Sequence, residues 1–178
     1  MFNTLSQIRM CHYFFIGLCL ITLVFLNGCS SSHKKDGPPS FYVDETRIPN
    51  AVPCNEPHSR IGNKPSYVVF GKTYHVMRSS KNYEAVGTAS WYGTQFHSRC
   101  TSNGERYNML AMTAAHKSLP LPTYVEVTNL KNHRKVIVKV NDRGPFARRR
   151  VMDLSREGGR KLGILDKGLT YADCLVLE

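Results

Sequence analysis

Residues 135–146 read Lys-Val-Ile-Val-Lys-Val-Asn-Asp-Arg-Gly-Pro-Phe, and this stretch decides the fold. The first half, Lys135 to Val140, follows the alternating pattern of a half-buried β-strand. The run from Asn141 to Pro145 is a strong turn signal, which ends that strand. Asp142 is therefore expected at the end of a strand, just before a Gly-Pro turn, where a β-barrel presents side chains to a groove.

Short strand-like runs recur on both sides of this stretch. A hairpin is predicted where Gly71-Lys72 separates Tyr67–Phe70 from Thr73–Val76. The other predicted strands are Val86–Tyr92, Tyr124–Leu130, Val151–Leu154 and Cys174–Leu177. One helix is expected over residues 156–162, with Ser155 as its N-cap and Gly163 as its C′ residue. Many short strands with one helix predict a small, mainly β barrel over residues 66–178.

The N-terminus is typical of an export signal. The 14 residues from Tyr13 to Leu26 are predominantly apolar, and they end in Leu26-Asn27-Gly28-Cys29. A membrane-spanning helix needs about 20 apolar residues, so this run is better interpreted as part of a signal peptide over residues 1–28. The sequence before Cys29 resembles a bacterial lipobox, which predicts that Cys29 is lipidated. The alternative is an ordinary signal peptide or anchor with an incidental cysteine.

Two further features concern the segment after Cys29. Ser30, rather than Asp, follows the cysteine, which suggests sorting to the outer membrane, with the protein facing the periplasm. Six of the nine prolines lie between Pro38 and Pro65, without a helical or strand period. Residues 29–65 are therefore expected to form an extended, mobile tether that precedes the barrel.

The remaining cysteines do not suggest a disulfide framework. Cys54, Cys100 and Cys174 stay in the mature chain, so at most one intramolecular bridge can form, and Cys100–Cys174 is the expected pair. His97 and Cys100 have the spacing of half a zinc site, but no second half is apparent. We therefore expect no metal and no cofactor.

The charge is strongly basic, with 24 Lys and Arg against 13 Asp and Glu. Such a balance favours polyanionic partners. Nucleic acid is not expected for an exported lipoprotein, whereas lipid head groups and peptidoglycan carboxylates are. The run Arg148–Arg150 is by default a solvated charge cluster, and it is alternatively an attractor of anionic wall polymer. No Walker loop, GxSxG, HExxH or dinucleotide fingerprint is present.

Three stretches carry a family resemblance. They are Gly87–His97 with Thr101–Glu105, Met112–Pro120, and Val140–Phe146 leading to Met152–Ser155. Together they resemble the rare lipoprotein A family of septal-ring lytic transglycosylases, over about residues 67–178. The resemblance implies a six-stranded double-psi β-barrel with one or two short helices, and it extends distantly to expansins. Many members carry a C-terminal SPOR domain, whereas this sequence ends at Glu178, so septal targeting by SPOR is not expected.

The resemblance implies an enzyme that cleaves the β-1,4 bond between N-acetylmuramic acid and N-acetylglucosamine in peptide-poor glycan strands. Asp142 is the first choice for the carboxyl that transfers the proton, and the alternative is that it caps its own turn. Arg143 is expected to hold a substrate carboxylate or to tune the charge. Glu105, after the turn at Asn103-Gly104, is the expected second carboxylate, with a plain surface role as the alternative. Asn103 is placed with the substrate-binding residues.

Further residues complete the predicted site. Asp153 matches the expansin-like aspartate and rivals Asp142, although a carboxylate near a helix N-terminus is stabilised in any case. His116 is expected to pass a proton or to bind a carboxylate, with a structural role as the alternative. Trp91, Tyr92 and Phe96 are expected to stack on sugars. Strand alternation would bury at least one of Trp91 and Tyr92.

Two functions without catalysis remain open. An expansin-like barrel that grips peptidoglycan without cutting it fits the same residues, because this fold need not be catalytic. A structural lipoprotein that scaffolds other wall enzymes is the third possibility. The sequence names no protein partner.

Overall fold

The computed structural model describes residue 44 and residues 47–177. The elements in chain order are β1 (Ser66–Val69), β2 (Lys72–His75), β3 (Glu84–Tyr92), η2 (Thr94–Phe96), β4 (Thr113–His116), β5 (Thr123–Asn129), β6 (Lys135–Asp142), β7 (Arg150–Ser155), α2 (Arg156–Leu162) and β8 (Leu169–Val176). The expected signal peptide, Cys29 and the first part of the tether lie outside the described residues.

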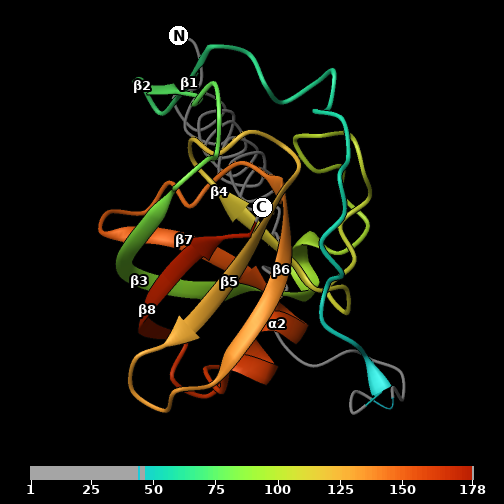
Figure 1. The fold of residues 1–178 in the computed structure, drawn as a ribbon, viewed down its shortest axis with the longest axis vertical. Helices are drawn as coiled ribbons and strands as arrows, with labels where there is room; N and C mark the ends of the chain where they lie inside the picture. Colours follow the sequence, from blue (N-terminus) through green and yellow to red (C-terminus); the bar gives the residue numbers. More distant parts are fainter. Residues whose placement is uncertain (1–43, 45–46, 178) are drawn as a thin grey trace, which may run out of the picture. The chain divides into compact units, whose positions relative to one another are not determined.

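Six strands close into a barrel in the order β3-β7-β4-β6-β5-β8 (Figure 1). β3 pairs with β7 and β4 pairs with β6 in parallel, while the other neighbours are antiparallel. This arrangement, with α2 as the α-helix, confirms the predicted double-psi β-barrel. β4 was not predicted, because all four of its residues are buried and its sequence does not alternate.

The barrel interior follows from the alternation of β5 and β6. Val125 and Val127 on β5, and Val136, Val138 and Val140 on β6, are at most 2 % exposed. Their neighbours along each strand are half-buried or exposed for the most part. The inward valines form one apolar core with residues from every other barrel strand, so the alternation that predicted the two strands separates buried from more exposed positions.

The predicted helix is confirmed at both ends. The Ser155 hydroxyl accepts a hydrogen bond from the Gly158 N–H, and Gly163 adopts φ 76° after the last turn. Gly159 allows α2 to approach β3 closely, because a Cβ there would lie 2.9 Å from Trp91 Cβ. The helix therefore supports the strand end that carries Trp91.

The predicted hairpin is also confirmed, with a turn one residue earlier than expected. β1 and β2 pair with Val69 opposite Lys72, so Phe70 and Gly71 form the two-residue turn. Both have positive φ, 50° and 73°, as a hairpin of this length requires. The Phe70 side chain at the tip is 93 % exposed.

The second half of the expected tether lies against the barrel. Ile48 and Ala51 pack on the apolar core, and the Ala51 N–H donates to the Ile137 carbonyl at 3.1 Å. Further along, Asn63 exchanges two hydrogen bonds with the backbone of Leu121, at 2.7 and 2.8 Å. Residues 48–63 therefore differ from the mobile chain that their proline content predicted, because specific hydrogen bonds hold them in place.

The predicted Cys100–Cys174 disulfide is wrong. Cys174 is buried, whereas Cys100 is exposed in a loop, and both thiols are free. The Cys174 side chain lies inside the barrel because its strand alternates, so the presence of both cysteines in the folded domain was not enough to pair them. In the described part of the chain, no helix has the length and apolar character needed to cross a membrane.

Candidate active site

Two carboxylates lie on either side of one small residue. Ala115 on β4 is in register with Asp142 at the end of β6 and with Asp153 on β7. Because neighbouring strands lie about 4.8 Å apart, the two aspartate Cα atoms are separated by roughly 10 Å. The methyl group of Ala115 leaves space between them.

That space is part of a cleft of about 580 Å³. Its aromatic residues are Phe70, Trp91, Tyr92, Phe96 and Phe146, and its other residues are Gln95, Ala115, Asp142, Arg143, Gly144, Pro145, Ala147, Arg150 and Asp153. A concave site of this size with a few convergent polar groups is typical of a ligand-binding site.

Asp142 is fixed through one of its two carboxylate oxygens. Oδ1 accepts hydrogen bonds from the Ser102 N–H at 2.8 Å, the Ser102 hydroxyl at 2.6 Å and the Arg143 N–H at 2.7 Å. All three bonds converge on Oδ1, which leaves Oδ2 for a ligand in the cleft. Asp142 therefore caps its own turn through Oδ1, as the alternative interpretation held. Oδ2 is still available for proton transfer to a ligand.

Asp153 has partners on both oxygens. Oδ1 accepts a hydrogen bond from the Ser90 hydroxyl, and Oδ2 lies 3.2 Å from an Arg150 guanidinium nitrogen. Burial raises the pKa of Asp153 above its ordinary value, and the opposing effects of Ser90, Arg150 and Lys117 do not cancel this. Asp153 thus retains its proton to a higher pH than an exposed aspartate does.

The predicted aromatic residues surround the two carboxylates. Trp91 and Tyr92 are both half-buried, and both line the cleft although strand alternation would separate them. Tyr92 stacks on Tyr107 with ring centroids 4.4 Å apart and meets Phe96 edge-on at 5.9 Å. Phe96 is 38 % exposed, so its ring is the more open surface for a sugar.

Glu105 does not line this cleft. Its carboxylate accepts a hydrogen bond from the Asn141 amide at 2.7 Å and pairs with the Lys139 ammonium at 3.1 Å. Burial acts to raise the pKa of Glu105, but the hydrogen bonds from Asn141 and Lys139 outweigh it and the pKa is lowered. Glu105 is therefore an ionised group that supports the end of β6.

His116 also lies outside the cleft. Its Nδ1 accepts hydrogen bonds from the N–H groups of Ser118 and Leu119, at 3.2 and 3.0 Å. Nε2 must then carry the hydrogen, which it donates to the Tyr83 hydroxyl at 2.9 Å. Burial, with the charges of Arg143 and Lys117, lowers the pKa of His116 to about 3. His116 therefore has the structural role that was the alternative, and it is not placed to transfer a proton to a substrate in the cleft.

Arg143 lines the cleft, but its guanidinium is already engaged. Its N–H groups donate to the carbonyl oxygens of Gly62, His116 and Leu119, at distances from 2.6 to 3.2 Å, and to the Asn63 side chain. The guanidinium of Arg143 therefore binds backbone carbonyl oxygens of the protein, rather than the substrate carboxylate that the sequence analysis expected.

Asn103 has a local role as well. Its side-chain oxygen accepts hydrogen bonds from the Thr101 hydroxyl at 2.7 Å and the Glu105 N–H at 3.2 Å, and it does not line the cleft. These bonds shape the turn that presents Ser102 to Asp142. The sequence had predicted substrate binding for Asn103, whereas Ser102, one residue earlier, makes the contact to the site.

Several residues of the cleft were not among the predicted site residues, and Arg150, Ala115 and Phe70 are three of them. Arg150, which pairs with Asp153, had been interpreted only as part of a charge run. Ala115 had no signal of its own beyond its place in the Met112–Pro120 stretch. Phe70 was assigned to the hairpin, and nothing local indicated that the hairpin tip borders the cleft. Among the described residues, no three His, Cys, Asp or Glu side chains gather closely enough to hold a metal ion.

A protein-family profile identifies the family of this chain. The profile described as "Lytic transglycolase" matches residues 84–172, which is half of the chain and runs from the start of β3 into β8. The chain belongs to the lytic transglycolase family. The matched residues include both cleft aspartates and exclude the β1–β2 hairpin.

Curated members of the lytic transglycolase family are similar over most of this chain. The "Endolytic peptidoglycan transglycosylase RlpA" of Pseudomonas aeruginosa is 53 % identical over 141 residues, which cover 79 % of this chain and 41 % of that protein. The protein of the same name from Vibrio cholerae is 44 % identical over 158 residues, covering 86 % and 60 %. That from Rickettsia felis is 39 % identical over 162 residues, covering 85 % and 69 %. The chain thus spans about half the length of several relatives that it matches.

Solved structures give more distant likenesses. The Streptomyces papain inhibitor has a TM-score of 0.41 at 21 % identity, covering 54 % of this chain and 96 % of that one. An expansin of Clavibacter michiganensis, solved with cellohexaose, has a TM-score of 0.42 at 20 % identity, covering 54 % and 51 %. Likenesses at this level have no bearing on the function of this lytic transglycolase family member.

The lowered pKa of His116 predicts a pH dependence of stability. The unfolded chain takes up a proton at His116 near pH 6.5, whereas the folded chain does not until about pH 3. The contribution of His116 to the free energy of unfolding is therefore fully present above pH 6.5, and it decreases as the pH falls below that value. Between pH 7 and pH 5 the loss is about 2 kcal/mol. This loss is measured by urea unfolding of the wild type and of His116→Gln at both pH values.

The control for this prediction is His75→Gln, which replaces an exposed histidine on β2. That variant should keep the pH dependence of the wild type, while His116→Gln should flatten it by about 2 kcal/mol. Equal slopes for the wild type and His116→Gln would contradict the buried, neutral state of His116.

Proposed function

We propose that this protein is an endolytic peptidoglycan transglycosylase. It would cleave the β-1,4 bond between N-acetylmuramic acid and N-acetylglucosamine and leave a 1,6-anhydro muramic acid end. The observation that carries the proposal is the pair Asp142 and Asp153, which flank Ala115 in one aromatic cleft of a lytic transglycolase family member. Relatives that carry this activity in their name match the chain at 39–53 % identity.

The chemistry requires one proton donor that later becomes a proton acceptor. As the bond between C1 of muramic acid and the glycosidic oxygen breaks, a carboxylic acid gives its proton to that oxygen. The C6 hydroxyl oxygen of the same sugar bonds to C1, and its proton passes to the carboxylate. The acid is thereby regenerated and no water is consumed. Because the attacking hydroxyl belongs to the same sugar, proximity favours the step.

Two criteria select different carboxyls for this transfer. The raised pKa of Asp153 favours it as the group that holds a proton. Access favours Asp142, because Asp142 has one oxygen free of hydrogen bonds while both oxygens of Asp153 are engaged. We assign the proton transfers to Asp142, since a donor must first reach the glycosidic oxygen. Asp153 is then a positioning residue that holds Arg150 and Ser90 at the opposite wall.

The substrate is proposed to be the glycan strand of the bacterial wall, with a preference for peptide-poor strands. The aromatic surfaces of Trp91 and Phe96 suit sugar faces, and the formal charge of +11 suits a polyanionic wall. The cleft aromatics lie beside the carboxylates, so a bound strand would place a glycosidic bond near Asp142.

We also propose that Cys29 carries lipid and attaches the protein to the outer membrane, with the barrel in the periplasm. The basis is the apolar run that ends at Cys29, with Ser30 after it. Two or three acyl chains hold a protein firmly to a bilayer, whereas one is marginal. Growth with labelled palmitate should mark the wild type and leave Cys29→Ser unlabelled. Equal labelling of both would show that the cysteine is not the site.

Replacement of the proposed acid tests the activity. Asp142→Asn should lower the formation of 1,6-anhydro products from peptide-free sacculi by about 100-fold or more, the usual contribution of general acid–base catalysis. The asparagine Oδ1 can still accept from Ser102, so the fold should be retained. Mass spectrometry of the released fragments, with thermal unfolding of each variant, measures both.

Asp166→Asn is the matched control, because Asp166 is exposed in the loop after α2 and outside the cleft. It should cleave as the wild type does. Asp153→Asn should lose activity less steeply than Asp142→Asn, with a change in KM as well as kcat. If Asp142→Asn cleaves normally and Asp153→Asn does not, the assignment of the two carboxyls must be exchanged. If the wild type releases no anhydro product but pellets with sacculi, the protein is a binding module.

A further inference from the structure

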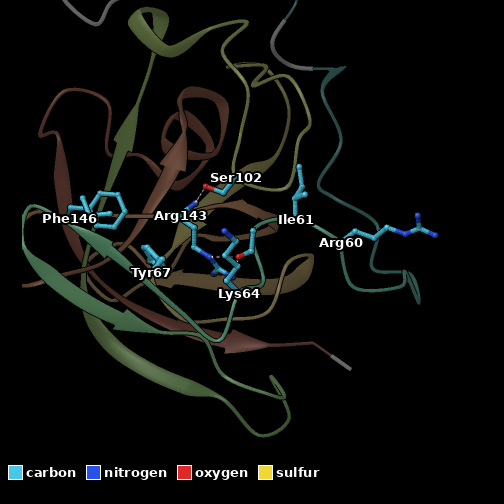
Figure 2. A pocket seen from close by; sticks show the side chains of 9 residues that line it. Arg60, Ile61, Lys64, Tyr67, Ser102, Arg143 and Phe146 are labelled. Carbon is cyan, nitrogen blue, oxygen red and sulfur yellow. Dashed lines mark hydrogen bonds between the residues drawn. The ribbon is translucent and has the colours of Figure 1, made fainter.

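A second pocket lies next to the cleft and is built largely by residues upstream of the family match. It has a volume of about 460 Å³ (Figure 2). Its lining residues are Arg60, Ile61, Gly62, Lys64, Tyr67, Val69, Ser102, Arg143 and Phe146. Residues 60–69 thus supply six of these nine, while the family match begins only at residue 84.

Arg143 links the two parts of the chain that form this pocket, and it contributes a positive charge to the lining. Its guanidinium donates to the Gly62 carbonyl at 3.0 and 2.8 Å, and to the Leu119 carbonyl at 2.6 Å, which ties the upstream segment to the barrel. All of its recorded side-chain partners are neutral. Within the described residues Arg143 forms no salt bridge, and Asp142, its neighbour in the chain, lines the cleft rather than this pocket. The Asp142 carboxylate favours the charged form of Arg143 through space, but burial outweighs this effect and lowers the pKa of Arg143.

Two further cations line the pocket, and none of its described lining residues is an acid. Lys64 and Arg60 are exposed, and neither forms an ion pair with any residue that the structure describes. Lys64 and Arg143 both line the pocket, whereas in Figure 2 the Arg60 side chain extends away from the other labelled residues. Because Lys64 and Arg143 line the pocket and none of its lining residues is an acid, the pocket favours an anion.

The rest of the pocket is apolar and aromatic. Tyr67 and Phe146 meet at a ring distance of 6.3 Å, and Tyr74 packs on both rings at 5.4 Å. An inorganic anion would gain nothing from such walls. A sugar ring that bears a carboxylate would use both the aromatic surface and the charge.

The pocket adjoins the cleft. Arg143 and Phe146 line both spaces. A polymer bound across Asp142 would therefore extend over Phe146 into the pocket. The same strand that is cut in the cleft is the natural occupant.

We propose that this pocket is a second glycan subsite, in which Lys64 binds the free lactyl carboxylate of an N-acetylmuramic acid on the strand held in the cleft. The inference rests on the proposed function and assigns a specificity role to residues outside the family match. A muramic acid that carries a stem peptide has an amide in place of this carboxylate. The pocket therefore discriminates in favour of sugars without a peptide.

Binding, rather than cleavage, tests the subsite. The probe is peptide-free glycan strands, prepared by amidase treatment of sacculi, and the same strands with their carboxylates converted to neutral methylamides. Affinity is measured with the full chain carrying Asp142→Asn, so the strands stay intact. Lys64→Gln in that background should bind the peptide-free strands about fivefold more weakly, as expected for one partly exposed ion pair. It should bind the methylamide strands unchanged.

Two variants serve as controls. Lys167→Gln removes an exposed lysine from the loop after α2, and it should leave both affinities as they are. Lys64→Arg keeps the charge and should retain most of the affinity for peptide-free strands. If Lys64→Gln weakens both kinds of strand equally, or neither, the lactyl contact does not exist.

A third set of strands separates the possible sources of the carboxylate. Strands that retain their stem peptides carry peptide carboxylates but no free lactyl group, and Lys64→Gln should not change their binding. An equal fivefold loss on those strands would identify the peptide as the ligand and overturn the proposal. Absence of anhydro products with the wild type would refute the proposed activity alone, because the binding measurements do not depend on cleavage.

Discussion

The pairing of β4 between β6 and β7 is the constraint on which the site depends. β4 is parallel to β6 and antiparallel to β7, so the chain must cross itself to place Ala115 next to both Asp142 and Asp153. The two aspartates are neighbours only because of this pairing. A closed barrel fixes it firmly, since each strand is held on both edges and a slip of register would reverse every inward side chain.

The half-buried cation Arg143 connects the fold to the site in a second way. One turn supplies Asp142 to the cleft and, one residue later, a guanidinium that fastens residues 62 and 63 to the barrel. A cation placed among carbonyl oxygens keeps its charge but loses water, so burial lowers its pKa and the cost of removing its partners is high. The cleft and the neighbouring pocket therefore depend on the same short turn.

Much of the fold could be predicted because its signals are local. Alternation identified β5 and β6, turn residues identified the hairpin, and Ser155 with Gly163 bounded α2. β4 was missed because a strand buried on all sides lacks alternation. The upstream segment was missed because its order comes from side chains, such as Asn63, that bond to distant backbone.

The site was predictable in its carboxylates and aromatics, and less so in its polar residues. Asp142, Asp153, Trp91 and Phe96 do share a cleft. Glu105 and His116 are instead bound to partners that local sequence does not reveal, Lys139 for the first and Tyr83 for the second. A motif states which residue types are present, while the partner of each polar group is decided by tertiary contacts.

The most direct measurement is a crystal structure of Asp142→Asn with a peptide-free glycan oligosaccharide. We expect a muramic acid over Ala115, with its glycosidic oxygen within about 3 Å of the substituted amide at position 142 and with a sugar face against Phe96 or Trp91. An oligosaccharide bound elsewhere on the barrel, with the space between residues 142 and 153 left open, would contradict this expectation.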